Sequence, residues 1–355
     1  KFKATLTMKT LKIGDLLALV MMMERINGAA RWMTFMGVQF QPSEVAKMAV
    51  IIVTAFILSK GQDEDGASPK AFKRIMIITG VICLLIAPEN LSTAALLFGV
   101  VYLMMFIGRV AMKKLLILAG GLAGVAIIGV TFLVLTKNSD LPFLHRFDTW
   151  RARIEKFTND NEVPAAKFDI DKDAQIAHAR IAVATSHVVG KGPGNSVQRD
   201  FLSQAFSDFI FAIIIEELGL IGGAFVVFLY VCLLIRVGRI AKKCERTFPA
   251  FLIIGIALLL VSQAIFNMMV AVGLAPVTGQ PLPLISKGGT STLINCAYIG
   301  MILSVSRYTA RLEEQKEHDA LIPMQVEVPA EETNSDAQTA AEPTAKVLNS
   351  DAEFE

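Results

Sequence analysis

The sequence has little of what a soluble enzyme would need. Charged residues make up only 19% of its 355 residues and hydrophobic residues 54%, so the mean hydropathy of +0.54 lies well above that of soluble domains. Four cysteines are too few for a disulfide-built scaffold and indicate free thiols. The chain has no Walker loop, Rossmann glycine pattern, HExxH or CxxC motif, and its four histidines show no metal-ligand spacing. Any work must therefore be driven by the substrate or by a gradient, with no bound nucleotide.

The net charge of +2 conceals an uneven distribution. Residues 313–355 hold 12 acidic and 2 basic residues, a balance of −10, so the other 312 residues carry +12. A basic excess can indicate nucleic-acid binding, but long apolar runs separate these bases and point to a membrane instead. We therefore expect no nucleic-acid partner, a transmembrane domain over 1–312, and a disordered acidic cytoplasmic tail over 313–355.

Seven apolar segments, with their flanks, can cross a bilayer core of about 30 Å as helices. They cover residues 45–59, 73–88, 91–112, 115–136, 209–235, 248–272 and 290–307. An N-terminal remnant at 13–23 resembles the end of a further helix. The expected fold is therefore an all-α polytopic integral membrane helical bundle. Basic clusters fall between alternate spans, which predicts a cytoplasmic C-terminus and an extracytoplasmic loop over 137–207.

The sharpest candidate for chemistry is Asp208, at the outer end of the fifth span among aromatic and apolar residues. Desolvation raises the pKa of a carboxyl group toward neutrality, which suits a general base. The alternative is a plain helix N-cap, a role that Asp fills well and that is compatible with the first.

Two further sets of charges lie in the apolar spans. Glu216 and Glu217 follow Asp208 in the same span, where carboxylates need partners. A buried contact that fixes helix packing is the favoured interpretation, and a proton or ion relay is the alternative. Glu44 and Lys47 share one helix face at i,i+3, after a helix start marked by Pro42. They are expected to pair, either as a structural ion pair or as part of a site.

The last outer loop, 276–291, contains three prolines and three glycines between apolar helices. Irregular backbone at membrane depth persists only inside protein or along a water-filled cavity. Gly288 and Gly289 precede a helix whose N-terminus could meet an anion such as pyrophosphate, and Lys287 adds positive charge. A plain turn is the alternative.

Four stretches of the sequence together resemble the signature of one protein family. They read NGAARW followed by QPSEVAK at 27–32 and 41–47, GPGNSVQR at 192–199, DFIFA with EELG at 208–219, and PVTGQPLPLISKGGTS at 276–291. In order and spacing they are similar to the motifs of the SEDS family (shape, elongation, division and sporulation), the FtsW/RodA peptidoglycan polymerases. The resemblance runs over about residues 24–308, and the set of motifs is far more specific than any one of them.

The resemblance implies a ten-helix membrane fold and a glycosyltransferase that polymerises lipid II and releases undecaprenyl pyrophosphate. Asp208 would be the catalytic base, and Glu44 and Lys47 the activation-linked pair of the central cavity. It also implies a class B penicillin-binding protein (an FtsI-like transpeptidase) as partner, with lipid II, nascent glycan and other divisome proteins. A divalent cation, Mg²⁺ or Mn²⁺, assists family members. The location implied is the bacterial cytoplasmic (inner) membrane.

The same motifs predict which residues line the substrate cavity. Besides Glu44 and Lys47, they are Arg31, Gln41, Lys191, Asn195, Ser196, Ser286, Lys287, Gly288 and Gly289. Three departures stand out: the chain has seven spans and a remnant, as if N-terminally truncated, Lys287 replaces a family Tyr, and Glu89 stands in a motif where the family has Asp.

Within the family, the TGQPLPL run and the long acidic tail favour the division type (FtsW) over the elongation type (RodA) and hence a place at the septum. Two other functions compete with polymerisation: a lipid II flippase or transporter, and a non-catalytic divisome scaffold. A transporter should concentrate its charges near the midplane, whereas this chain concentrates them at the outer face.

Overall fold

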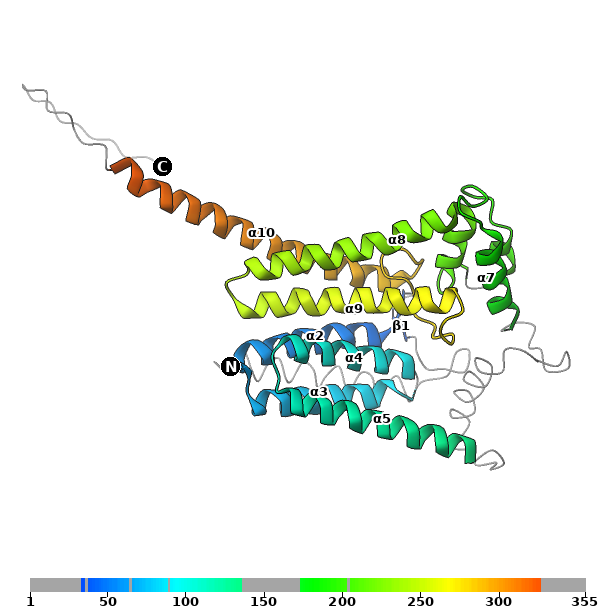
Figure 1. Cartoon of the computed structure of the whole chain (residues 1–355), viewed down its shortest axis with the longest axis horizontal. Coiled ribbons are helices and arrows are strands. Elements are labelled where there is room, and N and C mark those ends of the chain that lie inside the picture. The colour runs from blue at the N-terminus through cyan, green and yellow to red at the C-terminus, as the bar shows by residue number, and fades with distance from the viewer. Residues whose placement is uncertain are drawn as a thin grey trace, which may run out of the picture. The chain divides into compact units, whose positions relative to one another are not determined.

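The computed structural model describes residues 33–35, 38–63, 66–88, 90–135, 173–202 and 205–326. The predicted helix remnant at 13–23, Arg31, Glu89 and most of the outer loop 137–207 lie outside the described residues. The chain divides into two compact units, 1–309 and 310–355. Helices dominate the described part of the chain, which confirms the predicted all-α class (Figure 1).

Each of the seven expected spans coincides with a helix. They are α2 (Pro42–Lys60), α3 (Pro69–Ile86), α4 (Leu91–Ile107), α5 (Met112–Leu135), α8 (Ile210–Lys243), α9 (Thr247–Ala271) and α10 (Gly289–Val326). By length and composition, α2, α5, α8 and α9 can cross a membrane, and α4 is a shorter apolar helix. Helix α3 is largely apolar apart from three basic residues in its first two turns, Lys70, Lys73 and Arg74.

The remaining elements are short. Helix α7 (Asp173–Thr185) and a 3₁₀ turn at Gln198–Phe201 come from the outer segment. Two antiparallel pairs are present: β1 (Met33–Phe35) with β2 (Val38–Phe40), and β3 (Gln62–Asp63) with β4 (Gly66–Ala67). In the first pair Met33 lies opposite Phe40.

Helix starts follow their local sequence. Pro42 and Pro69 stand at the first turns of α2 and α3, where a missing N–H is harmless. Ser68 Oγ accepts from the N–H of Ala71, and Asn90 Oδ1 accepts from the N–H of Thr93 at 3.1 Å. Each side chain satisfies a backbone donor that its helix leaves without an acceptor.

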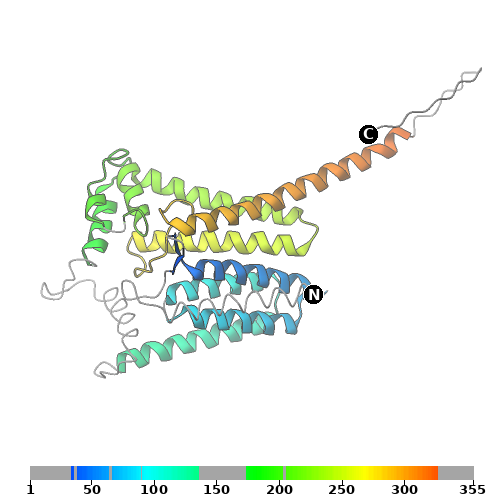
Figure 2. The ribbon, with the colours of Figure 1, turned by 180° about the vertical axis from the view of Figure 1, so that it is seen from behind.

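Helix α9 lies at the centre of the first unit, packed against α2, α4 and α8 (Figures 1 and 2). Its side chains Ile253 and Ile256 are fully buried with Ile51 of α2 and Leu97 of α4. Large apolar side chains on α5 and α8, in contrast, are exposed. An outward apolar surface of this extent is typical of a lipid-facing bundle, so the protein is a multi-pass membrane protein.

The turns between α2 and α3, α4 and α5, and α8 and α9 lie at one end of the bundle, opposite α7 (Figure 1). Hydrogen bonds join the first two turns: Gln62 Nε2 donates to Gly108 O at 2.8 Å, and the N–H of Ala67 donates to Arg109 O at 3.1 Å. All three turns carry the basic clusters found in the sequence, as the positive-inside pattern predicts.

Helix α10 continues to Val326, so the prediction of a disordered tail is wrong for residues 313–326. Glu, Gln and Lys predominate just after residue 312, and these residues are good helix formers despite their polarity. Residues 327–355 lie outside the described part.

Candidate functional site

A break divides helix α8 at Gly219, whose φ of 72° and ψ of −172° are not helical. Residues 210–218 and 220–243 are therefore two helical segments, and the predicted uninterrupted fifth span over 209–235 is corrected. Glu216 lies in the first segment, close to the break.

The glycine-rich loop after α7 supplies the hydrogen bonds that the break removes. The N–H groups of Lys191 and Gly192 donate to the carbonyls of Glu216 and Glu217 at 3.0 and 2.9 Å. On the other side of the break, the N–H groups of Leu220 and Ile221 donate to carbonyls at 187 and 188 at 3.2 and 3.3 Å. Helix ends need such partners because their backbone groups lack intrahelical ones.

Two glycines allow this close backbone approach. Gly190 and Gly219 have φ of 79° and 72°, a region that other residues rarely adopt. A Cβ on Gly219 would lie against the carbonyl of Val188, and a Cβ on Gly190 would lie against the carbonyl of Glu217, both far inside contact distance.

Gly219→Ala is therefore expected to destabilise the protein by about 3 kcal/mol or more, since backbone strain alone costs about 1–3 kcal/mol and the clash adds to it. Gly238→Ala is the matched control on the same helix, because Gly238 has open space around its Cα. It should change stability by less than about 1 kcal/mol. Thermal unfolding of both variants in detergent measures the difference, and similar behaviour of the two would contradict the role given to Gly219.

The Glu216 side chain is fully buried and accepts four hydrogen bonds. Lys191 Nζ lies 2.6 Å from Oε1, and Ser196 Oγ donates to Oε2 at 2.5 Å. The N–H groups of Val197 and Gln198 each donate at 3.3 Å. The favoured interpretation of Glu216 as a buried structural contact agrees with this geometry. The contact joins the glycine-rich loop to α8, however, and not one helix to another. Glu217 is only half-buried.

The predicted cavity residues of this loop are thus occupied in holding it together. Lys191 and Ser196 both contact Glu216, and the Asn195 side chain donates to the carbonyl of Lys191 at 3.1 Å. A direct contact of these three residues with substrate stays a prediction.

Asp208 lies just before α8 and is half-buried. The N-cap position of α8 belongs to Phe209, and no side chain caps the helix there, so the capping alternative for Asp208 is wrong. Ser207 Oγ donates to Asp208 Oδ1 at 3.0 Å. The Asp208 carboxylate is therefore held beside the helix start and does not serve as its cap.

The last outer loop packs against the chain around Asp208. Ser286 Oγ donates to the carbonyl of Ser207 at 2.6 Å and accepts from the N–H of Leu282 at 2.7 Å. The N–H of Lys287 donates to the carbonyl of Phe206 at 2.8 Å, while the Lys287 residue is exposed. The structure thus brings Ser286 and Lys287 next to the Asp208 segment.

The predicted glycines follow directly at the start of α10. The carbonyl of Gly288 accepts from the N–H of Thr292 at 2.9 Å, which begins the helix, and Gly289 is its first residue. Both are as expected for a helix start, and their contact with an anion stays a prediction.

Glu44 and Lys47 pair as predicted. Lys47 Nζ lies 2.7 Å from Glu44 Oε1, and the Lys47 and Glu44 side chains are 0% and 5% exposed. Gln41, also a predicted cavity residue, is the N-cap of α2 and makes no side-chain cap hydrogen bond. Lys47 Nζ in addition donates to Gln263 Oε1 on α9 at 3.3 Å.

The sequence reasoning missed the buried amides that surround this pair and the last outer loop. They are Gln263, Asn267 and Gln280. Polar side chains inside apolar spans were the available signal, but only ionisable ones were considered.

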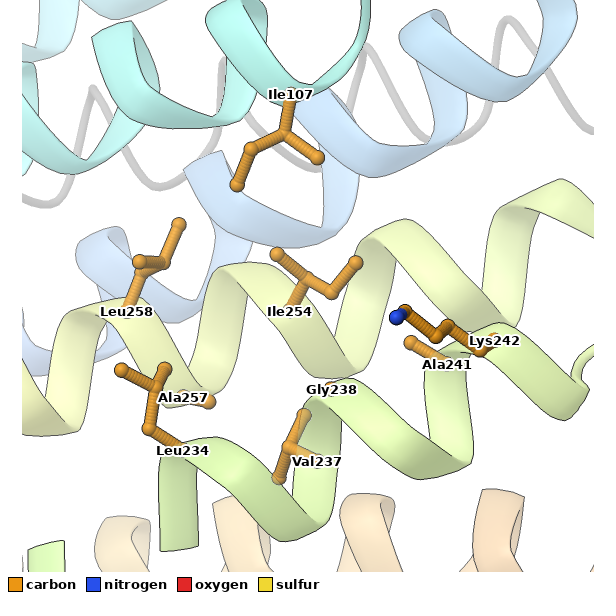
Figure 3. A pocket seen from close by; sticks show the side chains of 9 residues that line it. All are labelled: Ile107, Leu234, Val237, Gly238, Ala241, Lys242, Ile254, Ala257 and Leu258. Carbon is orange, nitrogen blue, oxygen red and sulfur yellow. The ribbon is translucent and has the colours of Figure 1, made fainter. Parts of the chain in front are cut away.

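A separate cavity of about 370 Å³ lies among α4, α8 and α9 (Figure 3). Its lining is apolar except for Lys242, near the C-terminal end of α8. Asp208 precedes the opposite end of that helix, so this cavity is not the place for chemistry at Asp208.

Fold and site together define a multi-pass helical membrane protein with a buried ion pair and a half-buried carboxylate, Asp208, whose backbone segment is hydrogen-bonded to an irregular loop. The family model described as cell cycle protein, covering FtsW, RodA and SpoVE, matches residues 3–311. The chain therefore belongs to this family, and the resemblance seen in the motifs is confirmed.

Relatives named probable peptidoglycan glycosyltransferase FtsW show the same. One from Geobacter sp. (strain M18) is 34% identical over 282 residues, which are 79% of this chain and 72% of the relative. Another from Coxiella burnetii is 32% identical over 293 residues, 80% of this chain and 73% of the relative. These names confirm the predicted enzyme class, a glycosyltransferase.

Two solved structures have the same fold. A chain of a peptidoglycan synthase complex, described for its structural coordination of polymerization and crosslinking, has a TM-score of 0.66 and 25% identity, covering 86% of this chain and 82% of that one. The rod shape determining protein RodA of Thermus thermophilus has a TM-score of 0.58 and 23% identity, covering 86% and 79%.

Proposed function

We propose that this chain polymerises lipid II into glycan strands during cell division, with Asp208 as the general base. The observation that carries the proposal is the position of Asp208, a half-buried carboxylate that does not cap α8 and whose backbone segment is held by the last outer loop. A rigidly held base within reach of a substrate hydroxyl is what proton abstraction requires.

In the proposed step the Asp208 carboxylate takes the proton from the C4 hydroxyl of the acceptor GlcNAc. The oxygen forms a bond to C1 of the donor MurNAc as the bond from C1 to the pyrophosphate oxygen breaks. Undecaprenyl pyrophosphate leaves with the bonding electron pair. The lipid-linked donor thus supplies the driving force, in keeping with a sequence that has no nucleotide-binding motif.

A divalent cation, Mg²⁺ or Mn²⁺, at the leaving pyrophosphate is part of the proposal. Within the described ranges no group of three His, Cys, Asp or Glu side chains could hold a metal ion. Mg²⁺ is commonly bound by one or two carboxylates together with substrate phosphates.

The proposed partner is a class B penicillin-binding protein of the FtsI type, together with other divisome proteins. The similarity to a chain of a peptidoglycan synthase complex, in which polymerization is coordinated with crosslinking, supports a transpeptidase partner. The proposed location is the septal inner membrane, with the C-terminus in the cytoplasm. The basic turns at one end of the bundle support this orientation of the C-terminus.

A lipid II transporter is the main competing function. Polymerisation of labelled lipid II by the purified protein with its transpeptidase partner tests the proposal, and movement of lipid II across proteoliposome membranes is followed in parallel. Glycan strands are the expected product. Transport without glycan synthesis would show a transporter and not a polymerase. The absence of both activities would favour a non-catalytic scaffold.

A further inference from the structure

Two side-chain amides on α9 lie between the buried ion pair and the last outer loop. Gln263 and Asn267 are one helical turn apart and are 3% and 1% exposed. Gln263 Oε1 accepts from Lys47 Nζ at 3.3 Å, and Gln263 Nε2 donates to the carbonyl of Pro281 at 3.2 Å. A single amide therefore joins the buried ammonium group to the loop.

Asn267 joins the same loop to Asp208. Its Nδ2 donates to the carbonyl of Asp208 and to the carbonyl of Gln280, both at 2.8 Å. Because both partners are carbonyls, the amide must turn its NH₂ group toward them. Its Oδ1 is buried and, among the residues described, has no hydrogen-bond partner. Leaving such an atom unsatisfied carries a desolvation penalty, so the orientation is set by the two donated bonds.

Two successive loop residues are held by these amides, and the next residue is held within the loop. Gln280 and Pro281 are held through their carbonyls by Asn267 and Gln263, and the N–H of Leu282 donates to Ser286 Oγ. Gln280 Nε2 also donates to Thr93 Oγ1 of α4 at 2.6 Å. The loop therefore cannot move relative to α9 without breaking several buried hydrogen bonds, which the nonpolar surroundings make expensive.

We infer that Gln263 and Asn267 are positioning residues that fix the backbone of Asp208 relative to the Glu44–Lys47 pair. The inference rests on the proposed function of Asp208 as base. A change at the ion pair reaches Asp208 along a continuous path: Lys47, Gln263, the loop and Asn267. Since misplacement by about 1 Å can cost about 100-fold in rate, these amides should control turnover rather than lipid II binding.

The test measures kcat and KM for lipid II in Gln263→Met, which keeps the side-chain length and removes both hydrogen bonds. We expect kcat to fall about 10- to 100-fold and KM to change by less than about threefold. Gln263→Glu should lower kcat similarly, because it can still contact Lys47 but has no donor for the carbonyl of Pro281. Combining Gln263→Met with Lys47→Met should lower kcat no further than the worse single variant, since the two act in series.

Ser262→Ala is the matched control, because Ser262 neighbours Gln263 on α9 and takes part in none of these contacts; it should keep the kcat of the unmutated protein. A folded Gln263→Met variant with normal kcat would overturn the inference and leave the polymerase intact. So would independent, multiplicative losses in the combined variant. If Gln263→Met unfolds, kcat is measured for Asn267→Asp instead, and a normal kcat in that variant would likewise overturn the inference. No glycan from the unmutated protein would overturn the proposed function and this inference together.

Discussion

Asp208→Asn is expected to abolish lipid II polymerisation while leaving the protein folded. Asn has the shape of Asp but cannot take the proton of the acceptor hydroxyl. A general base contributes about 10²–10⁴-fold to a rate, so the initial rate of glycan synthesis should fall by at least about 100-fold. Separation of labelled glycan strands by gel electrophoresis measures that rate.

Folding should survive because the hydrogen bonds that Ser207 and Asn267 make to residue 208 do not need its charge. Ser207 Oγ finds an oxygen acceptor in either side chain, and Asn267 contacts only the backbone carbonyl of residue 208. Unchanged thermal unfolding and co-purification with the transpeptidase would verify this.

Asp200→Asn provides a matched control for the loss of charge. Asp200 is a nearby carboxylate whose side chain is 75% exposed beside Arg199, so its variant should polymerise lipid II at the normal rate. Glycan synthesis by Asp208→Asn at a similar rate would show that Asp208 is not the base.

Glu216→Ala is expected to cause the largest loss of stability among the charged positions. The substitution leaves four donors without their acceptor, and one of the four is the ammonium group of Lys191. Removing one member of a buried pair typically costs about 3–5 kcal/mol. The glycine-rich loop should then detach from the break in α8, and proteolysis between α7 and α8 should accelerate.

Glu217→Ala tests whether stability depends on the hydrogen-bonded carboxylate of Glu216 or on any acidic side chain in this segment. Glu217 is half-buried, and its backbone carbonyl, which contacts Gly192, is unchanged by the substitution. Its variant should differ from the unmutated protein by no more than about 0.5 kcal/mol. Equal losses in thermal unfolding for the two variants would argue against Glu216 as the specific anchor.

The helices and the buried ion pair could be predicted from sequence because both depend on local spacing. Apolar length marked the spans, and the i,i+3 placement of Glu44 and Lys47 put them on one face of α2. Asp208 stood out as a charge at the outer end of a span. Whether its side chain caps the helix could be decided only from the observed start of α8.

The break at Gly219 could not be predicted, because glycine is common within membrane helices and nothing in the apolar run marks a change of direction. Its stability depends on the loop 187–192, which lies far away in sequence. The polarity of Gln263 and Asn267 inside an apolar span was visible in the sequence, but their partners on other segments were not. Composition likewise indicated disorder just after residue 312, where helix-forming residues continue α10.

The contact between the last outer loop and the Asp208 segment also bears on how freely position 287 can evolve. Lys287 joins that segment through its main-chain N–H, and the residue is exposed. Every amino acid except proline carries that N–H. Position 287 can therefore carry lysine in place of the tyrosine that the family resemblance implies without losing this hydrogen bond, and proline is the one substitution that would remove it.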